Sequence, residues 1–131
     1  MESAPVMAAP PQTVHDRDGF LVWHSGFVLS PHGDLVTLLE VSSRSGHDFL
    51  TDPAWDLMAR EEFPVRATAR AGDGPEIAGS VSEKKITKRG VFETVRFRGF
   101  GTRIPDGSVA EFVILPLAIE FTVPLDGLRA P

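Results

Sequence analysis

Hydrophobic residues recur at every second position over most of this chain, a pattern typical of β-strands with one buried face. Residues 20–30, with a kink at Gly26, and residues 35–42 show it most clearly. Between them lies Pro31-His32-Gly33-Asp34, a sequence that favours a turn. The pattern therefore predicts a first β-hairpin.

The same alternation predicts strands farther along the chain. Residues 65–70 form a short strand, and residues 77–87 and 91–98 pair across a turn that ends at Gly90. Residues 109–115 and 117–123 form the last strand pair. Pro116 cannot donate a hydrogen bond to a sheet, so we expect a bend or a change of sheet there.

One segment does not alternate. Asp52 suits a helix N-cap and Pro53 suits the first helical position, while Pro64 disfavours helix beyond residue 62. Trp55 and Met58 follow at helical spacing. The sequence thus predicts one short helix near residues 53–62.

These elements define a mainly β protein. We expect an antiparallel β-sandwich, immunoglobulin-like, or a small closed barrel, with seven to eight strands and the one helix. The length of 131 residues fits a flexible N-terminal arm, 1–13, and a single β domain, 14–131. There is no Cys, no signal-like start and no apolar run of the ~18 residues that a membrane helix needs, so we expect a soluble, cytoplasmic protein without disulfides.

Charge is unevenly distributed. The formal net charge is -5, yet residues 84–103 hold seven of the 13 Lys and Arg residues and one acid, Glu93. These bases are Lys84, Lys85, Lys88, Arg89, Arg96, Arg98 and Arg103. They are the predicted binding residues, because a positive hairpin on a negative protein suits an acidic partner.

Alternation also assigns faces to the strand 91–98. Val91, Val95 and Phe97 share one face with Glu93, and this face is predicted to be buried. The other face carries Phe92, Thr94, Arg96 and Arg98, which are predicted to be exposed.

Arg98-Gly99-Phe100-Gly101 resembles the opening of the RNP1 motif of RNA-recognition domains, in which exposed aromatic rings stack on bases. The resemblance covers four residues, and the chain then departs from the motif at Thr102 and Arg103. The better interpretation is that Phe100 packs at a bent strand end. The second alternative function, weak nucleic-acid binding, rests separately on phosphate contacts from Arg96 and Arg98, with Lys84 or Lys85 opposite them.

An enzyme is the first alternative. If the strands enclosed an apolar pocket lined by Trp23, Phe27 and Phe112, His24 or His47 with Asp48 would form an acid-base set for a small isomerase, cyclase or lyase. His24 shares a strand face with Phe20 and Val22, which also suits a packed core residue. None of the four His has the spacing of a metal ligand, so no metal and no cofactor are predicted.

The favoured function is a non-catalytic interaction or assembly module. It binds an acidic protein surface through the basic hairpin 84–103, or it self-associates into a homo-oligomer. The segregated charges and the apolar strand 112–115 favour self-association. A nucleic acid or a membrane is not the predicted partner.

Overall fold

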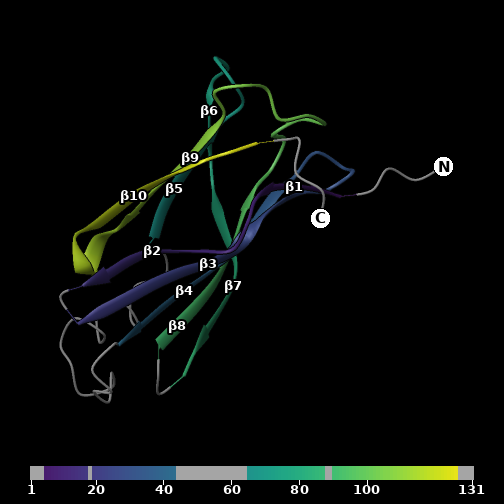
Figure 1. The fold of residues 1–131 in the computed structure, drawn as a ribbon. Helices are drawn as coiled ribbons and strands as arrows, with labels where there is room; N and C mark the ends of the chain where they lie inside the picture. Colours follow the sequence, from purple (N-terminus) through teal and green to yellow (C-terminus); the bar gives the residue numbers. More distant parts are fainter. Residues whose placement is uncertain (1–4, 18, 44–64, 88–89, 127–131) are drawn as a thin grey trace.

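The computed structural model describes residues 5–17, 19–43, 65–87 and 90–126. These residues form ten strands and a short 3-10 turn (Figure 1). In chain order the elements are β1 (Val6–Ala9), β2 (Gln12–Arg17), β3 (Phe20–Leu29), β4 (Leu35–Ser43), β5 (Val65–Arg70), β6 (Glu76–Ala78), β7 (Ser80–Ile86), β8 (Gly90–Phe97), β9 (Val109–Ile114), the turn Leu115–Leu117 and β10 (Ile119–Pro124). The helix predicted near residues 53–62 lies outside the described residues.

The strands form two antiparallel sheets that face each other as a sandwich. Sheet A has the order β1-β3-β4-β8-β7, with β2 also paired to β3, and sheet B has the order β10-β9-β5-β6. Figure 1 shows the sheets as separate layers, with β3, β4 and β8 in one and β10, β9 and β5 in the other. The mainly β sandwich is confirmed, whereas the closed barrel and the count of seven to eight strands are wrong.

The predicted first hairpin is β3 with β4. Their register shifts between His24 and Phe27, where Ser25 and Gly26 form a bulge. Gly26 has a φ of +96°, and an added Cβ would lie 2.9 Å from the Ala9 carbonyl oxygen, so the kink requires glycine. The bulge lets both His24 and Phe27 face the interior.

The N-terminal segment differs from the predicted flexible arm. β1 pairs with the second half of β3, and β2 pairs with the first half. Ala8 and Ala9 are buried, because small side chains let this segment lie close against β3. The sequence signal was weak because proline and alanine are uncommon in strands.

Residues 77–87 do not form one strand. Residues 76–78 pair with β5 in sheet B, and residues 80–86 pair with β8 in sheet A. The chain crosses between the sheets at Gly79, whose N–H donates to the Ala67 carbonyl at 2.8 Å. A side chain there would meet Phe97 and Val95, so glycine allows the crossing.

Pro116 lies in the 3-10 turn between β9 and β10, which pair with each other in sheet B. It marks a bend and not a change of sheet. Ala118 closes this turn with a φ of 52°.

Three phenylalanines fill the space between the sheets. The ring centroids of Phe27 and Phe112 lie 5.8 Å apart, and those of Phe97 and Phe112 lie 6.1 Å apart, both edge-to-face. All three are almost fully buried, and each contributes about 1.5–3 kcal/mol to stability by leaving water. Phe112 and Ile114 therefore belong to the core and not to an exposed apolar strand.

Candidate functional site

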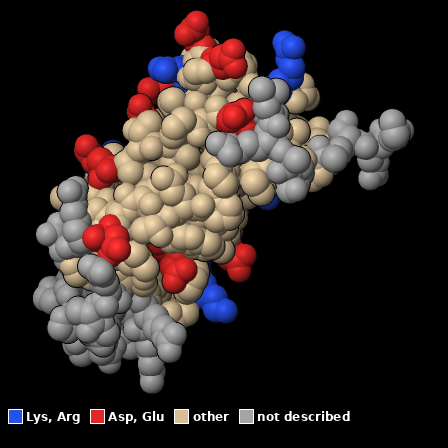
Figure 2. All heavy atoms as spheres, in the orientation of Figure 1, with Lys and Arg blue, Asp and Glu red and all other residues tan. Residues whose placement is uncertain are grey.

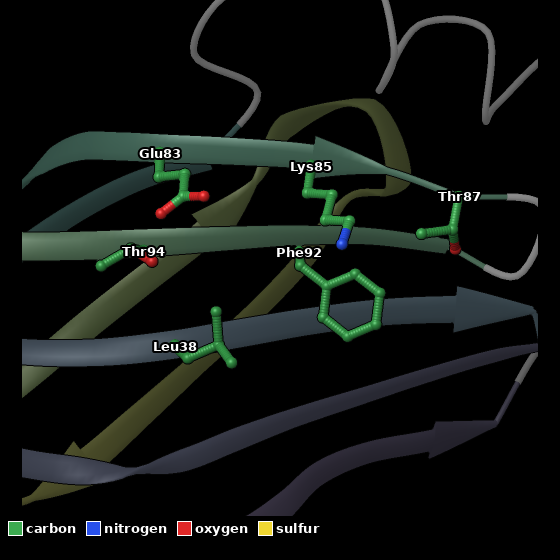
Figure 3. A pocket seen from close by; sticks show the side chains of 6 residues that line it. All are labelled: Leu38, Glu83, Lys85, Thr87, Phe92 and Thr94. Carbon is green, nitrogen blue, oxygen red and sulfur yellow. The ribbon is translucent and has the colours of Figure 1, made fainter.

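A hollow of about 350 Å³ lies on the outer face of sheet A, the face turned away from sheet B. Its floor is formed by Leu38 of β4 and by Phe92 and Thr94 of β8. Glu83 and Lys85 of β7, with Thr87 just after that strand, form its rim. Figure 3 shows Phe92 and Leu38 side by side, with Glu83 and Lys85 on the strand beyond them.

The strand alternation places these side chains together. Leu38 lies across from Thr94, Glu83 lies across from Thr94 on the other side, and Lys85 lies across from Phe92. Since neighbours on adjacent strands share a face, the six residues form one surface without any loop being needed to position it.

The apolar surface continues beyond the hollow. Trp23 lies in the row of Glu40 and Phe92, and Val28 lies in the row of Val36 and Arg96. Trp23 and Val36 are half-buried, and Val28 is 37% exposed. The outer face of sheet A thus carries several apolar side chains, with Glu40 between Trp23 and Phe92 and Arg96 beside Val36.

The outer face of sheet B also borders a hollow, of about 500 Å³, which Arg66, Glu111 and Val113 help to line, but charged residues of both signs lie across this face. Arg66, Thr68, Glu111 and Glu120 lie there, with Val113 half-buried among them. A shallow depression at this surface is lined partly by Glu111 and Glu120. Alternating charges of both signs are typical of a face that stays in water.

The structure divides the predicted basic surface. Lys84 lies on the inner face of β7 across from Glu93, whereas Lys85 lies on the outer face at the hollow. Arg98 and Arg103 are exposed in the segment after β8. Lys88 and Arg89 lie outside the described residues. The described members of the basic stretch therefore do not form one patch.

Arg96 lies on the outer face of β8, as predicted, but its charge is paired. Its Nη1 lies 3.2 Å from Oδ2 of Asp34, and Oδ1 of Asp34 accepts a hydrogen bond from the Gly99 N–H at 3.3 Å. On the face shown in Figure 2, acidic side chains are scattered and the few basic ones stand apart from one another. Long polyanions bind to continuous rows of bases, which this face does not offer.

His24 is completely buried on the inner face of β3, with its ring centroid 5.0 Å from that of Phe27. Its Nδ1 accepts a hydrogen bond from the Gly26 N–H at 3.0 Å, so the neutral ring carries its proton on Nε2. Burial lowers the pKa of His24, which favours this neutral form. A general base needs a lone pair directed at a substrate, and the lone pair of His24 is already used.

Glu93 is the second buried ionisable group. It is 2% exposed on the inner face of β8, and neither carboxyl oxygen has a hydrogen-bond partner among the residues that the structure describes. Burial raises the pKa of Glu93 to about 7, and the positive charge of Lys84 partly opposes this shift. At neutral pH a large share of Glu93 is therefore an uncharged acid.

The remaining predicted residues do not complete a catalytic set. His47 and Asp48 lie outside the described residues, and Trp23 lies on the opposite face of sheet A from Phe27. In the described part of the chain no three His, Asp or Glu side chains come together as metal ligands do.

Sequence alternation did contain the signals for the hollow and for the buried acid. The exposed set on strand 91–98 includes Phe92 and Thr94 of the hollow, and Glu93 stands in the apolar set of the same strand. Leu38 was missed as a site residue, because an apolar residue on the second face of a strand has no chemical signature of its own.

No protein-family model matches the chain, and comparisons with curated proteins and with solved structures found no match. None of the helical structure in the described ranges is long and apolar enough to span a membrane.

Proposed function

We propose that this protein is a non-catalytic assembly module that binds a second copy of itself through the outer face of sheet A. The observation that carries the proposal is the hollow, where a half-buried and mainly apolar floor has one acid, Glu83, and one base, Lys85, on its rim. Apolar surface of this kind gains free energy when a partner removes it from water.

The rim favours a second copy over other partners. In a two-fold contact the same surface meets itself, so a residue on one subunit faces a different residue of the other. Glu83 and Lys85 lie on one strand beside the same floor, and rotation by 180° would bring each opposite its counterpart of opposite charge. The hollow thus offers complementary charges to its own copy.

The charge of the whole chain also matters. With a net charge of -5, two copies repel each other over most of their surfaces. At the hollow, one acid and one base cancel, and nearby the charge of Arg96 is paired with that of Asp34. Contact centred on the hollow therefore adds no net charge there, and Glu40, in the row of Trp23 and Phe92, is one further acid on this face.

The other predicted functions have less support. Binding of an acidic partner through the hairpin 84–103, or of nucleic acid, needs bases on one surface, and Lys84 and Lys85 lie on opposite faces. An acid-base enzyme needs an accessible base, and His24 is buried with its Nδ1 occupied. An immunoglobulin-like strand arrangement and a cytoplasmic location stay predictions from the sequence.

The test is a measurement of molecular mass by sedimentation and light scattering over a concentration series. The wild type should dimerise. Leu38→Glu places a charge on the apolar floor and should raise the dissociation constant by on the order of a hundredfold. The matched control is Val109→Glu, a half-buried valine on the outer face of sheet B, which should leave the mass unchanged.

A charge swap identifies the partner. Glu83→Lys and Lys85→Glu should each weaken the dimer, because each places like charges opposite one another across the contact. The double variant should restore it, since the charges are again complementary. A wild type that stays monomeric at the highest concentration, or a double variant as weak as the singles, would overturn the two-fold contact. Binding to an acidic partner would give a different result, because Lys85→Glu would weaken binding and Glu83→Lys would strengthen it.

A further inference from the structure

The inner face of sheet A holds a row of polar and apolar side chains across four adjacent strands. His24 of β3 lies across from Leu39 of β4, Leu39 lies across from Glu93 of β8, and Glu93 lies across from Lys84 of β7. His24, Leu39 and Glu93 are each at most 2% exposed. The row therefore begins deep in the sandwich and ends at its edge.

The two ionisable groups in the interior lack partners that buried polar groups normally have. Within the described ranges, both oxygens of Glu93 and the Nε2 of His24 have no hydrogen-bond partner. Most buried polar atoms in proteins are paired, and a buried carboxylate without a partner is far more costly than a buried carboxylic acid. The fold therefore accepts Glu93 in its neutral form and resists its ionisation.

Apart from Lys84, the described surroundings of Glu93 contain little to stabilise a negative charge. On β8 its inner-face neighbours are Val91 and Val95, and on β4 it faces Leu39. The inner faces of β5, β9 and β10 carry apolar side chains, which are Val65, Ala67, Ala69, Ala110, Phe112, Ile114, Ile119, Phe121 and Val123. Among the described residues, Lys84 of β7 is the charged group across from Glu93, and His24 lies two strands away.

Water can reach Glu93 most easily from the side of β7. In the described part of the chain β7 pairs with β8 and with no second strand, so it is an edge of sheet A. Ile86, which lies across from Val91 on the same face as Glu93, is 44% exposed. One strand and a partly open inner face thus separate the carboxyl group from solvent.

We propose that Glu93 acts as a pH-dependent latch, which holds the β7–β8 hairpin closed while its carboxyl group is neutral and loosens the hairpin when that group ionises and takes up water. The latch is a property of each single chain and does not rest on self-association. Local opening at a strand edge costs less free energy than unfolding of the whole sandwich, so the response is expected to concentrate in β7 and β8.

The direction of the pH dependence follows from the two buried groups. The pKa of Glu93 is raised from 4.5 to about 7, so its contribution to stability is complete below pH 4.5 and is lost as the pH rises from 4.5 to 7. The pKa of His24 is lowered from 6.5, so its contribution is complete above pH 6.5 and is lost as the pH falls below that value. The contributions of Glu93 and His24 to stability change in opposite directions with pH. The pH dependence of wild-type stability is therefore shallow and reveals neither group.

Replacing Glu93 and His24 one at a time separates their contributions to the pH dependence of stability. We would measure urea unfolding from pH 4 to pH 8.5 for the wild type, Glu93→Gln and, as the opposite case, His24→Asn, which keeps an acceptor for the Gly26 N–H. The ratio of the folding constants of Glu93→Gln and wild type should rise by on the order of a hundredfold between the two ends of this range. The same ratio for His24→Asn should change in the other direction, rising as the pH falls. Glu111→Gln, an exposed acid on β9, is the matched control and should give a flat ratio.

Hydrogen exchange locates the response. After correction for intrinsic exchange rates, amides of β7 should lose protection between pH 5.5 and pH 8 in the wild type but not in Glu93→Gln, while amides of β9 keep theirs. If Glu93→Gln does not fold, the carboxyl carbon of Glu93 can be titrated by NMR in the wild type. A Glu93→Gln ratio that does not change with pH, a carboxyl group that titrates near 4.5, or a loss of protection equal in β7 and β9 would overturn the latch.

Discussion

Strand β8 carries two faces that differ in an unexpected way. Its outer face places Phe92 and Thr94 on a surface that water can reach, while its inner face buries the carboxyl group of Glu93 among apolar side chains. In an ordinary half-buried strand the ring would lie inside and the acid outside. In the isolated chain, the water-accessible ring of Phe92 and the buried carboxyl group of Glu93 each lower stability. The first points to association, and the second points to a response to pH.

On the outer face a partner would remove this loss of stability, because a second chain can cover Phe92 and Leu38. On the inner face protonation of Glu93 would remove it, because a neutral carboxyl group needs no counter-charge. Association and protonation are therefore expected to act on opposite faces of the same strand. Experiments on stability can tell how far the two faces are independent.

The largest expected difference between the faces is in packing. Phe97→Ala removes a fully buried ring that contacts Phe112 edge-to-face, and it should lower the free energy of unfolding by about 3–5 kcal/mol. Phe92→Ala on the outer face should cost about 1 kcal/mol in the monomer, because the ring is only half-buried and its loss opens no cavity between the sheets. Urea unfolding at low protein concentration compares the two. Equal losses would mean that the outer face is also part of a core.

Gly79→Ala tests the inner face from the point where the chain crosses between the sheets. The new methyl group would lie 2.8 Å from Cε1 of Phe97 and 3.0 Å from Cγ1 of Val95. Overpacking of this kind should lower the free energy of unfolding by about 1–3 kcal/mol. Ser80→Ala at the next residue is the control and should change stability by about 0.5 kcal/mol or less. An unchanged free energy of unfolding for Gly79→Ala would show that the side chains of Phe97 and Val95 can move to make room for the methyl group.

The smallest effect is expected for the ion pair on the outer face. Arg96→Ala breaks the contact with Asp34, and since both side chains are partly exposed the loss should be about 0.2–1 kcal/mol. The loss should shrink further at high salt, because mobile ions screen exposed charges. Thermal unfolding at low and high salt measures it. A large loss that salt does not change would mean that Arg96 contributes by packing its stem against the sheet.

The strands were predictable wherever side chains alternate strictly. Leu35, Thr37, Leu39 and Val41 are all buried and all on one face of β4, as their spacing indicates. β1 was not predictable, because its burial depends on contact with β3 and not on a hydrophobic pattern of its own. The division of residues 76–86 between two sheets was also hidden, since a strand that changes sheets keeps the alternation of a single strand.

The candidate sites also contain some features that alternation predicts and others that it does not. Alternation alone assigns Phe92 and Arg96 to one face of β8 and Glu93 to the other. It also puts Lys84 and Lys85 on opposite faces, but it could not tell which of them faces inward, because a register shift between Val81 and Glu83 decides that. It also could not show that Asp34 would neutralise Arg96 from 62 residues away.

The sequence by itself determined which side chains share a face, because the period of a strand is a local property of the backbone. It also determined that this chain is mainly β and acidic, with its bases concentrated in one stretch. The tertiary structure decided what each face meets. Sheet B covers the inner face of sheet A and encloses Glu93 and His24, whereas the outer face is left with a hollow over Leu38 and Phe92. Burial depends on how two sheets come together, and contacts between residues far apart in the chain are not encoded in any local pattern.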